Sequence, residues 1–326
     1  MTDRRRLAAF GLAAGLLLVG TSALAQAWPT ARPVRIVVSQ AAGAAPDILA
    51  RQLADRLSKG LGQAVFVENR PGAGNIIGAQ AVAKAAPDGY TFFLATAAAL
   101  VTNPLTFKNL PYDPTKDFTT VSLVGRNPFF IVAHPSLGAR TVPELVALDK
   151  ATPGSLSFSS DGPRGFAGMM GEWFNKRSGA RLRQIPYVST TQALGDTVGN
   201  TTPLSVQAVG VAEPFVRKGS LRALAVSSSQ RLPGFEDVPT IAESYPGFEI
   251  NGWFALVAPA RTPPEIVKRL NAEMNLALGD PAIVARMRDF GIYTEGPGSP
   301  EKADQFVQSE RELWSKLTQT IGIEPE

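Results

Sequence analysis

Short apolar runs alternate along the chain with segments whose apolar residues recur at helical spacing. The clearest unit is 63–96, where an apolar run at 64–67 precedes a glycine turn, a helical stretch at 76–86 and a second apolar run at 90–95. Strand, helix and strand in this order predict a βαβ unit with a right-handed crossover. The same alternation elsewhere predicts an α/β fold with mostly parallel sheets and helices on both faces.

The remaining elements follow from the same alternation. Apolar runs predict strands at 34–38, 121–124, 129–133, 156–159, 184–187, 204–208 and 223–227, and a long strand at 248–259. Helices are expected at 142–150 with Thr141 as N-cap, at 191–198, and after a loop at 160–165. Four more are expected to begin at prolines, which suit the first helical position, namely Pro46, Pro264, Pro281 and Pro300. Thr262 and Pro263 are expected to cap the helix at Pro264.

The first 27 residues form a segment of their own. Residues 4–6 are arginines, an uncharged run extends from Leu7 to Ala25, and small residues follow. This order indicates a secretory signal peptide, with cleavage near Ala25–Ala27 and export to the periplasm. The arginines leave both the general secretory route and the twin-arginine route open. A membrane anchor is the alternative, and the richness in alanine and glycine disfavours it.

Composition removes several classes of chemistry. The chain has 326 residues, a formal net charge of +4, no cysteine and a single histidine, His134. It therefore lacks disulfides and zinc-ligand spacing, and His134 stands without a serine nucleophile motif. The turn at 72–74 resembles the start of a dinucleotide fingerprint, but Gly78 falls one position late. We expect no enzymatic activity, no metal and no cofactor, and the lack of basic runs with interleaved aromatics argues against nucleic acid.

An exported α/β protein without catalytic groups is most readily understood as a binding protein. Ligands of such folds bind where loops leave the carboxyl ends of parallel strands. Helix N-termini in those loops offer backbone N–H groups and the positive end of a dipole, so a carboxylate suits them.

Several motifs resemble one family along essentially the whole chain after the signal peptide. They are ENRPGAG at 68–74, AAPDGY at 85–90, LPYDP at 110–114, LRALAV at 221–226 and DVPT at 237–240. They resemble the substrate-binding proteins of tripartite tricarboxylate transporters, also called the Bug family. The resemblance implies a periplasmic binding protein with two α/β lobes, 28–127 plus 250–326 and 128–249. The ligand would lie in a cleft between the lobes that closes about the crossings.

The resemblance also implies ligand and partners. A small carboxylate would be held largely by loop backbone, hydroxyl groups and bridging water, and a monomeric protein would deliver it to a membrane permease. The alternative is a protein that presents its ligand to a membrane sensor kinase instead. The positions that match the family's ligand-binding loops are Gln40, Ala44, Ala45, Thr96, Ala97, Ser160, Asp161, Arg164, Gly165, Phe166, Tyr187 and Gln207.

Departures from the family pattern at these positions suggest a ligand preference. Alanines at 97–99 replace hydroxyl residues, Asp161 replaces a common serine, and Gln207 replaces a common aspartate. Arg164 is the strong cation of the second-lobe loop and would hold the carboxylate. The cleft would then suit an acid with an apolar or aromatic body. The alternatives are that Arg164 is a solvated loop residue, that Phe166 packs under the loop, and that the alanines start a buried helix.

Overall fold

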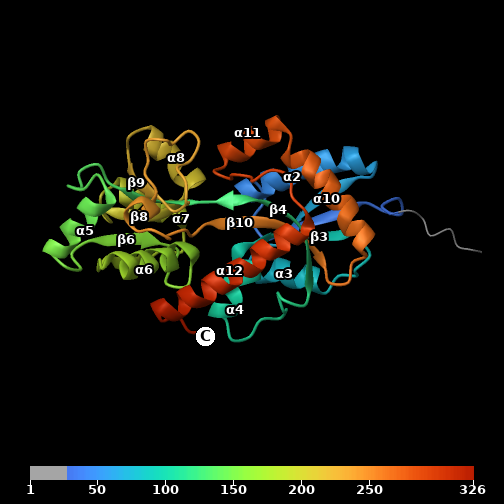
Figure 1. Ribbon diagram of the computed structural model, residues 1–326, viewed down its shortest axis with the longest axis horizontal. Helices are drawn as coiled ribbons and strands as arrows, with labels where there is room; N and C mark the ends of the chain where they lie inside the picture. The colour runs from blue at the N-terminus through green and yellow to red at the C-terminus, as the bar shows by residue number, and fades with distance from the viewer. Residues whose placement is uncertain (1–27) are drawn as a thin grey trace, which may run out of the picture.

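Two five-stranded sheets form the two lobes of the molecule (Figure 1). The computed structural model describes residues 28–326, so the predicted signal peptide lies outside the described residues. The first sheet, in the order β2-β1-β3-β10-β4, consists of β1 (Val34–Val38), β2 (Val65–Asn69), β3 (Thr91–Thr96), β4 (Phe118–Asn127) and β10 (Gly252–Pro259). The second, in the order β7-β6-β8-β5-β9, consists of β5 (Phe129–Ala133), β6 (Ser157–Ser160), β7 (Arg183–Pro186), β8 (Leu204–Ala208) and β9 (Arg222–Val226). The predicted α/β fold with two lobes is confirmed.

Each sheet is mixed, because the strands that connect the lobes run against their neighbours. β1 pairs in parallel with β2 and β3, and β6 with β7 and β8, whereas β10 and β5 are antiparallel to the strands beside them. The chain leaves one sheet at the carboxyl edge of its parallel strands and enters the other sheet at the carboxyl edge of that sheet. The entering strand therefore runs antiparallel to the strands beside it. The strand predicted over 248–259 begins only at Gly252, since residues 248–251 form one of these crossings.

Helices cover the two sheets, and the sequence pattern predicted most of them but not those at 103–106, 209–217 and 241–244. In the first lobe they are α2 (Ala45–Leu61), α3 (Ile76–Ala83), α4 (Asn103–Thr106), α10 (Pro264–Leu278), α11 (Pro281–Asp289) and α12 (Pro300–Ile321), with short turns η1 (Ala73–Asn75) and η2 (Ala98–Thr102). In the second lobe they are α5 (Val142–Ala151), α6 (Phe166–Ser178), α7 (Thr190–Val198), α8 (Val209–Arg217) and α9 (Ile241–Ser244).

The caps explain where several helices begin. Thr141 accepts a hydrogen bond from the backbone N–H of Glu144, as predicted, and Asp280 and Ser299 cap α11 and α12 in the same way. The predicted cap at Thr262 is wrong. Pro263 occupies the N-cap of α10, and the Thr262 hydroxyl donates instead to the carbonyl of Pro259 at 2.7 Å.

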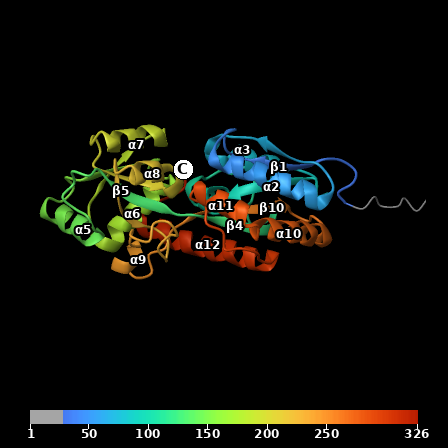
Figure 2. The same cartoon turned by 90° about the horizontal axis from the view of Figure 1, so that it is seen from above.

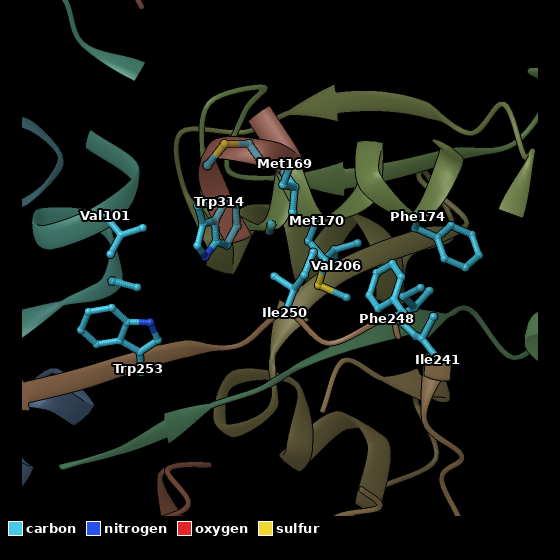
Figure 3. Close-up of a cluster of buried hydrophobic side chains, with 14 of the residues drawn as sticks. Val101, Met169, Met170, Phe174, Val206, Ile241, Phe248, Ile250, Trp253 and Trp314 are labelled. Carbon is cyan, nitrogen blue, oxygen red and sulfur yellow. The ribbon is translucent and has the colours of Figure 1, made fainter. Parts of the chain in front are cut away.

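One cluster of buried side chains is shared by the two lobes (Figure 3). It contains Phe93 and Trp253 of the first sheet, Phe158 of the second, Met169 of α6 and Trp314 of α12. Figure 1 shows α12 running diagonally across the front of the molecule from the first lobe to the second. The lobes are therefore joined by apolar burial on the side of α12 as well as by two chain crossings.

Glu310 lies at this joint and gives it a dependence on pH. Its Oε2 accepts a hydrogen bond from Trp253 Nε1 at 2.9 Å, and burial raises the pKa of its carboxyl despite that bond. A folded-state pKa above the unfolded value means that this side chain favours folding at low pH. That contribution is lost as the pH rises through the folded pKa.

We therefore expect Glu310→Gln to gain thermal stability relative to the wild type as the pH rises. The amide keeps an acceptor for the Trp253 indole but has no charge to desolvate. Melting curves of both proteins, from below the ordinary glutamate pKa up to neutral pH, measure the difference. A difference in melting temperature that stays constant over that range would contradict the assignment.

Candidate functional site

The strand register places the carboxyl edges of the two sheets opposite each other. Thr96, which ends β3, pairs with Phe254 near the start of β10, just after the chain has crossed from the second lobe. Ala208, which ends β8, pairs with Phe129 at the start of β5, just after the other crossing. Figure 2 shows α7 and α8 opposite α2 and α3, with β4, β10 and α12 along one side. Loops that leave these two edges therefore face the space between the lobes.

The loop after β1 presents an amide side chain at this edge. Asn75 Oδ1 accepts hydrogen bonds from Ser39 Oγ at 2.8 Å and from Gln40 Nε2 at 3.0 Å. The Gln40 Oε1 atom is buried and has no hydrogen-bond partner. A buried acceptor without a partner is unusual in proteins. It can accept only from a donor group of a ligand, so a carboxylate would have to meet the amide N–H of Gln40 instead.

The N-terminus of α2 lies beside it and has no side-chain cap. Ala44 is the N-cap, Pro46 stands within the first turn, and Ala45 begins the helix. Asp47 is 2% exposed and accepts hydrogen bonds from Gly43 N at 2.9 Å and Asn69 Nδ2 at 2.8 Å. Asp47 thus fixes the loop, while no side chain caps the first amides of α2.

The residues that follow β3 are mostly committed to the core. Thr96 Oγ1 accepts a hydrogen bond from Ala99 N at 3.2 Å, and the side chains of Ala97 and Ala99 are buried. The Thr96 hydroxyl is therefore the polar group of this segment, and the alanine side chains pack into the hydrophobic core.

Two second-lobe candidates are held by internal hydrogen bonds. Ser160 is 1% exposed, and its Oγ accepts from Gln184 Nε2 at 2.7 Å and from Gly162 N at 3.2 Å. Gln207 is 3% exposed and donates through Nε2 to Ser205 Oγ at 2.9 Å. These contacts fix the edge of the second sheet and leave the loop at 161–166 to face the first lobe.

Tyr187 follows β7 at the same edge. Its hydroxyl donates to Asp196 Oδ2 at 2.7 Å, and burial together with this carboxylate raises the pKa of the phenol. This hydrogen bond holds the Tyr187 ring against α7.

Arg164 reaches across to the first lobe. Its Nη1 lies 2.6 Å from Glu326 Oε1, and its Nη2 donates to the carbonyl of Glu324 at 3.2 Å. Glu326 is itself held on the first lobe, where its backbone N–H donates to Thr106 O and its carbonyl accepts from Lys108 N. In this structure a carboxylate of the chain therefore occupies the position on Arg164 that a ligand carboxylate is predicted to take.

Phe166 packs within the joint between the lobes. Its ring centroid lies 4.7 Å from that of Phe129 in a stacked arrangement and 4.8 Å from that of Trp314. Gly165 immediately before it is the N-cap of α6. The loop that carries Asp161 and Arg164 is thus held at its end by aromatic packing.

Sequence reasoning missed Asn75, Phe129, Trp314 and Glu326 as partners of the candidate residues. Asn75 had a local signal, because it sits in the glycine turn with a φ of +76°, where asparagine is tolerated. The other three are far from their partners in the chain, and nothing in the local pattern indicates them.

Cavities also lie elsewhere among the described residues. One of about 530 Å³ lies in the first lobe and is lined by Phe118, Thr120, Lys268 and Arg311. Another of about 400 Å³ lies at the crossings and is lined by Arg126, Glu249 and Tyr293.

Other chemistry is limited in residues 28–326. No group of three or more His, Cys, Asp or Glu side chains there is arranged to hold a metal ion, and His134 Nδ1 lies 2.7 Å from Ser136 Oγ. Of the helices in this range, none combines the length and apolarity needed to cross a membrane.

Comparisons with known proteins agree on one family. A family model described as the tripartite tricarboxylate transporter family receptor matches residues 49–323. A UPF0065 protein of Bordetella bronchiseptica is 40% identical over 328 residues, covering 97% of this chain and 95% of that protein. BugT of Bordetella pertussis is 35% identical, covering 99% of each chain.

Solved structures are similar over nearly the same length. Rpa4515 of R. palustris with adipate has a TM-score of 0.81 and 34% identity, covering 92% of this chain and 100% of that one. MatC of Rhodopseudomonas palustris with bound malate has a TM-score of 0.75 and 30% identity, covering 88% and 99%.

Proposed function

The chain belongs to the tripartite tricarboxylate transporter receptor family, and we propose that it captures a small carboxylate between its two lobes in the periplasm. The observation that carries this proposal is the facing pair of carboxyl edges, with the uncapped N-terminus of α2 on one side. Backbone N–H groups at such a terminus suit an anion without requiring a cationic side chain. The adipate and malate bound in similar structures support the same ligand class.

The candidate contacts divide between the lobes. Gln40, the first turn of α2 at Ala44 and Ala45, and Thr96 would hold the ligand from the first lobe. From the second lobe, the loop residues at 161–166 would meet the rest of the ligand when the lobes close. A ligand with an apolar or aromatic body is the preference that the alanines at 97–99 predict, although the Ala97 and Ala99 side chains themselves pack into the core.

Delivery would be to the membrane permease subunits of a tripartite tricarboxylate transporter. Family membership supports this partner. Uptake of the identified acid by cells with and without the protein would test delivery separately from binding.

Isothermal titration of residues 28–326 tests the binding proposal. We expect saturable, one-to-one binding of adipate or benzoate, weaker binding of citrate, and no binding of the matched uncharged amides adipamide and benzamide. The amides control for apolar contact, since they keep the body of the acid and lose its charge. Binding of an amide as tight as that of its acid would count against carboxylate recognition. Tight citrate binding without any response to benzoate or adipate would contradict the preference for an apolar body.

A further inference from the structure

Asp161 places a carboxylate directly on the N-terminus of α6. Its Oδ1 accepts a hydrogen bond from Gly168 N at 3.1 Å, and the backbone amides of Phe166 and Ala167 also stabilise its charged form. Gly165 makes room for it, because a Cβ at that position would lie 2.1 Å from Asp161 Oδ1. The anion-favouring end of this helix is therefore already filled by the chain itself.

Asp161 belongs to the loop that follows β6 at the carboxyl edge of the second sheet. Its side chain is exposed to solvent, yet burial among protein atoms raises the pKa of Asp161 against the effect of the hydrogen bonds. Arg164 and Phe166 in the same loop contact Glu326 and Trp314 of the first lobe, which fixes the direction in which the loop faces.

The negative charge of Asp161 meets the N-terminus of α6 but no cationic side chain of the described residues. It forms no ion pair with any of them, and Arg164, the cation of its own loop, is paired with Glu326. The second-lobe face of the candidate cleft thus offers an exposed, unpaired carboxylate. A second negative charge placed near it would be repelled, and the repulsion grows where the closing lobes exclude water.

We propose that Asp161 determines ligand specificity by rejecting a second carboxylate and accepting a hydrogen bond from a donor, such as an ammonium group, at the second-lobe end of the ligand. This inference rests on the proposed capture of a carboxylate between the lobes. The ligand carboxylate would be held on the first lobe by the N-terminus of α2, and the far end would meet Asp161. The preferred class is then a monocarboxylate with a distal donor rather than a dicarboxylate such as adipate.

Three six-carbon acids separate charge from shape at the distal end. Adipate carries a second carboxylate, hexanoate a methyl group and 6-aminohexanoate an ammonium group on the same chain. If the titrations identify an aromatic ligand, terephthalate, benzoate and 4-(aminomethyl)benzoate form the equivalent set. We expect the wild type to bind the amino acid of the set at least tenfold more tightly than the diacid.

Asp161→Asn is the decisive variant, because its amide oxygen can still accept the Gly168 hydrogen bond. We expect it to bind the diacid at least tenfold more tightly than the wild type does and the amino acid at least tenfold more weakly. The acid with a neutral end should change little. Asp161→Glu keeps the charge and should keep the order of the wild type. Asp237→Asn removes an equal charge from an exposed position of the same lobe and should also leave that order unchanged.

The outcomes distinguish the inference from the function on which it rests. A wild type that binds the diacid as tightly as the amino acid overturns the role of Asp161 and leaves carboxylate capture standing. The same holds if Asp161→Asn leaves the ratio of the two affinities unchanged. If Asp161→Asn fails to fold, as judged by circular dichroism, the wild-type ratio and the Asp161→Glu order decide the question. Failure of every carboxylate to bind removes the proposed function and this inference together.

Discussion

Trp314→Ala is expected to lower the free energy of unfolding by about 3–5 kcal/mol, the range for large-to-small changes at buried aromatic residues. Trp314 is fully buried, and its ring lies 4.8 Å from that of Phe166 in the second lobe. The lost free energy of unfolding therefore comes from the contact that joins the lobes. We expect the wild type to unfold in a single transition and Trp314→Ala in two, because each sheet keeps its own packing while the shared cluster is broken.

Trp173→Ala is the matched control. Trp173 is a half-buried tryptophan on α6 that packs against the edge of the same cluster and stacks with Arg177. Its loss should cost less stability and leave a single transition, since it is only half-buried and its cation–π partner Arg177 lies on the same helix. Chemical denaturation followed by circular dichroism measures both variants. Equal losses for the two tryptophans, or a single transition in Trp314→Ala, would contradict a joint that couples the lobes.

Local patterns predicted the elements of this fold well because the forces that define them act over a few residues. The apolar run of β1, the glycine turn before α3 and the Thr141 cap were all readable from neighbouring positions. The antiparallel entry of β10 was not readable, because it depends on which edge the chain crosses after leaving the other lobe. The direction of β10 is set by how the two sheets pack, and the apolar pattern within 252–259 does not indicate it.

The candidate site shows the same division. The positions of the loops follow from the ends of strands, so the sequence places Gln40, Thr96 and Ser160 at one edge of their sheets. The hydrogen bonds and packing contacts that each side chain makes depend on residues far away in the sequence. Arg164 meets Glu326 and Phe166 meets Trp314 only because α12 brings the end of the chain to the second lobe. The resemblance to a family supplied the candidate positions, whereas their hydrogen bonds had to come from the structure.

A second contact between the lobes lies at the ends of α8 and α11, where two glycines let the backbones touch. A Cβ on Gly210 would lie 2.2 Å from Phe290 O, and a Cβ on Gly291 would lie 2.3 Å from Gly210 N. Tyr293, just beyond, packs against the apolar cluster of the second lobe, and burial raises its pKa to about 12. This contact borders the carboxyl edge of β8 and sets how closely the lobes approach there.

Gly210→Ala is expected to force the lobes apart at this edge. Gly210 lies in a helix, so alanine suits its backbone, and the cost comes from the collision with Phe290 O, a backbone atom that cannot rotate away. Overpacking of this kind costs about 1–3 kcal/mol. Where about 1.4 kcal/mol of this cost falls on the closed, ligand-bound arrangement of the lobes, carboxylate binding weakens by about tenfold.

Gly195→Ala on α7 separates this steric effect from the change of residue type. No heavy atom lies within 4 Å of a Cβ built there, so alanine should stabilise the helix by up to about 1 kcal/mol and leave the ligand affinity unchanged. Denaturation curves and titration with the acid that binds most tightly to the wild type measure both variants. Wild-type stability together with wild-type affinity in Gly210→Ala would show that the two backbones do not define the spacing of the lobes. If Gly210→Ala loses affinity but little stability, the core of each lobe is intact. The variant has then changed the relative position of the lobes.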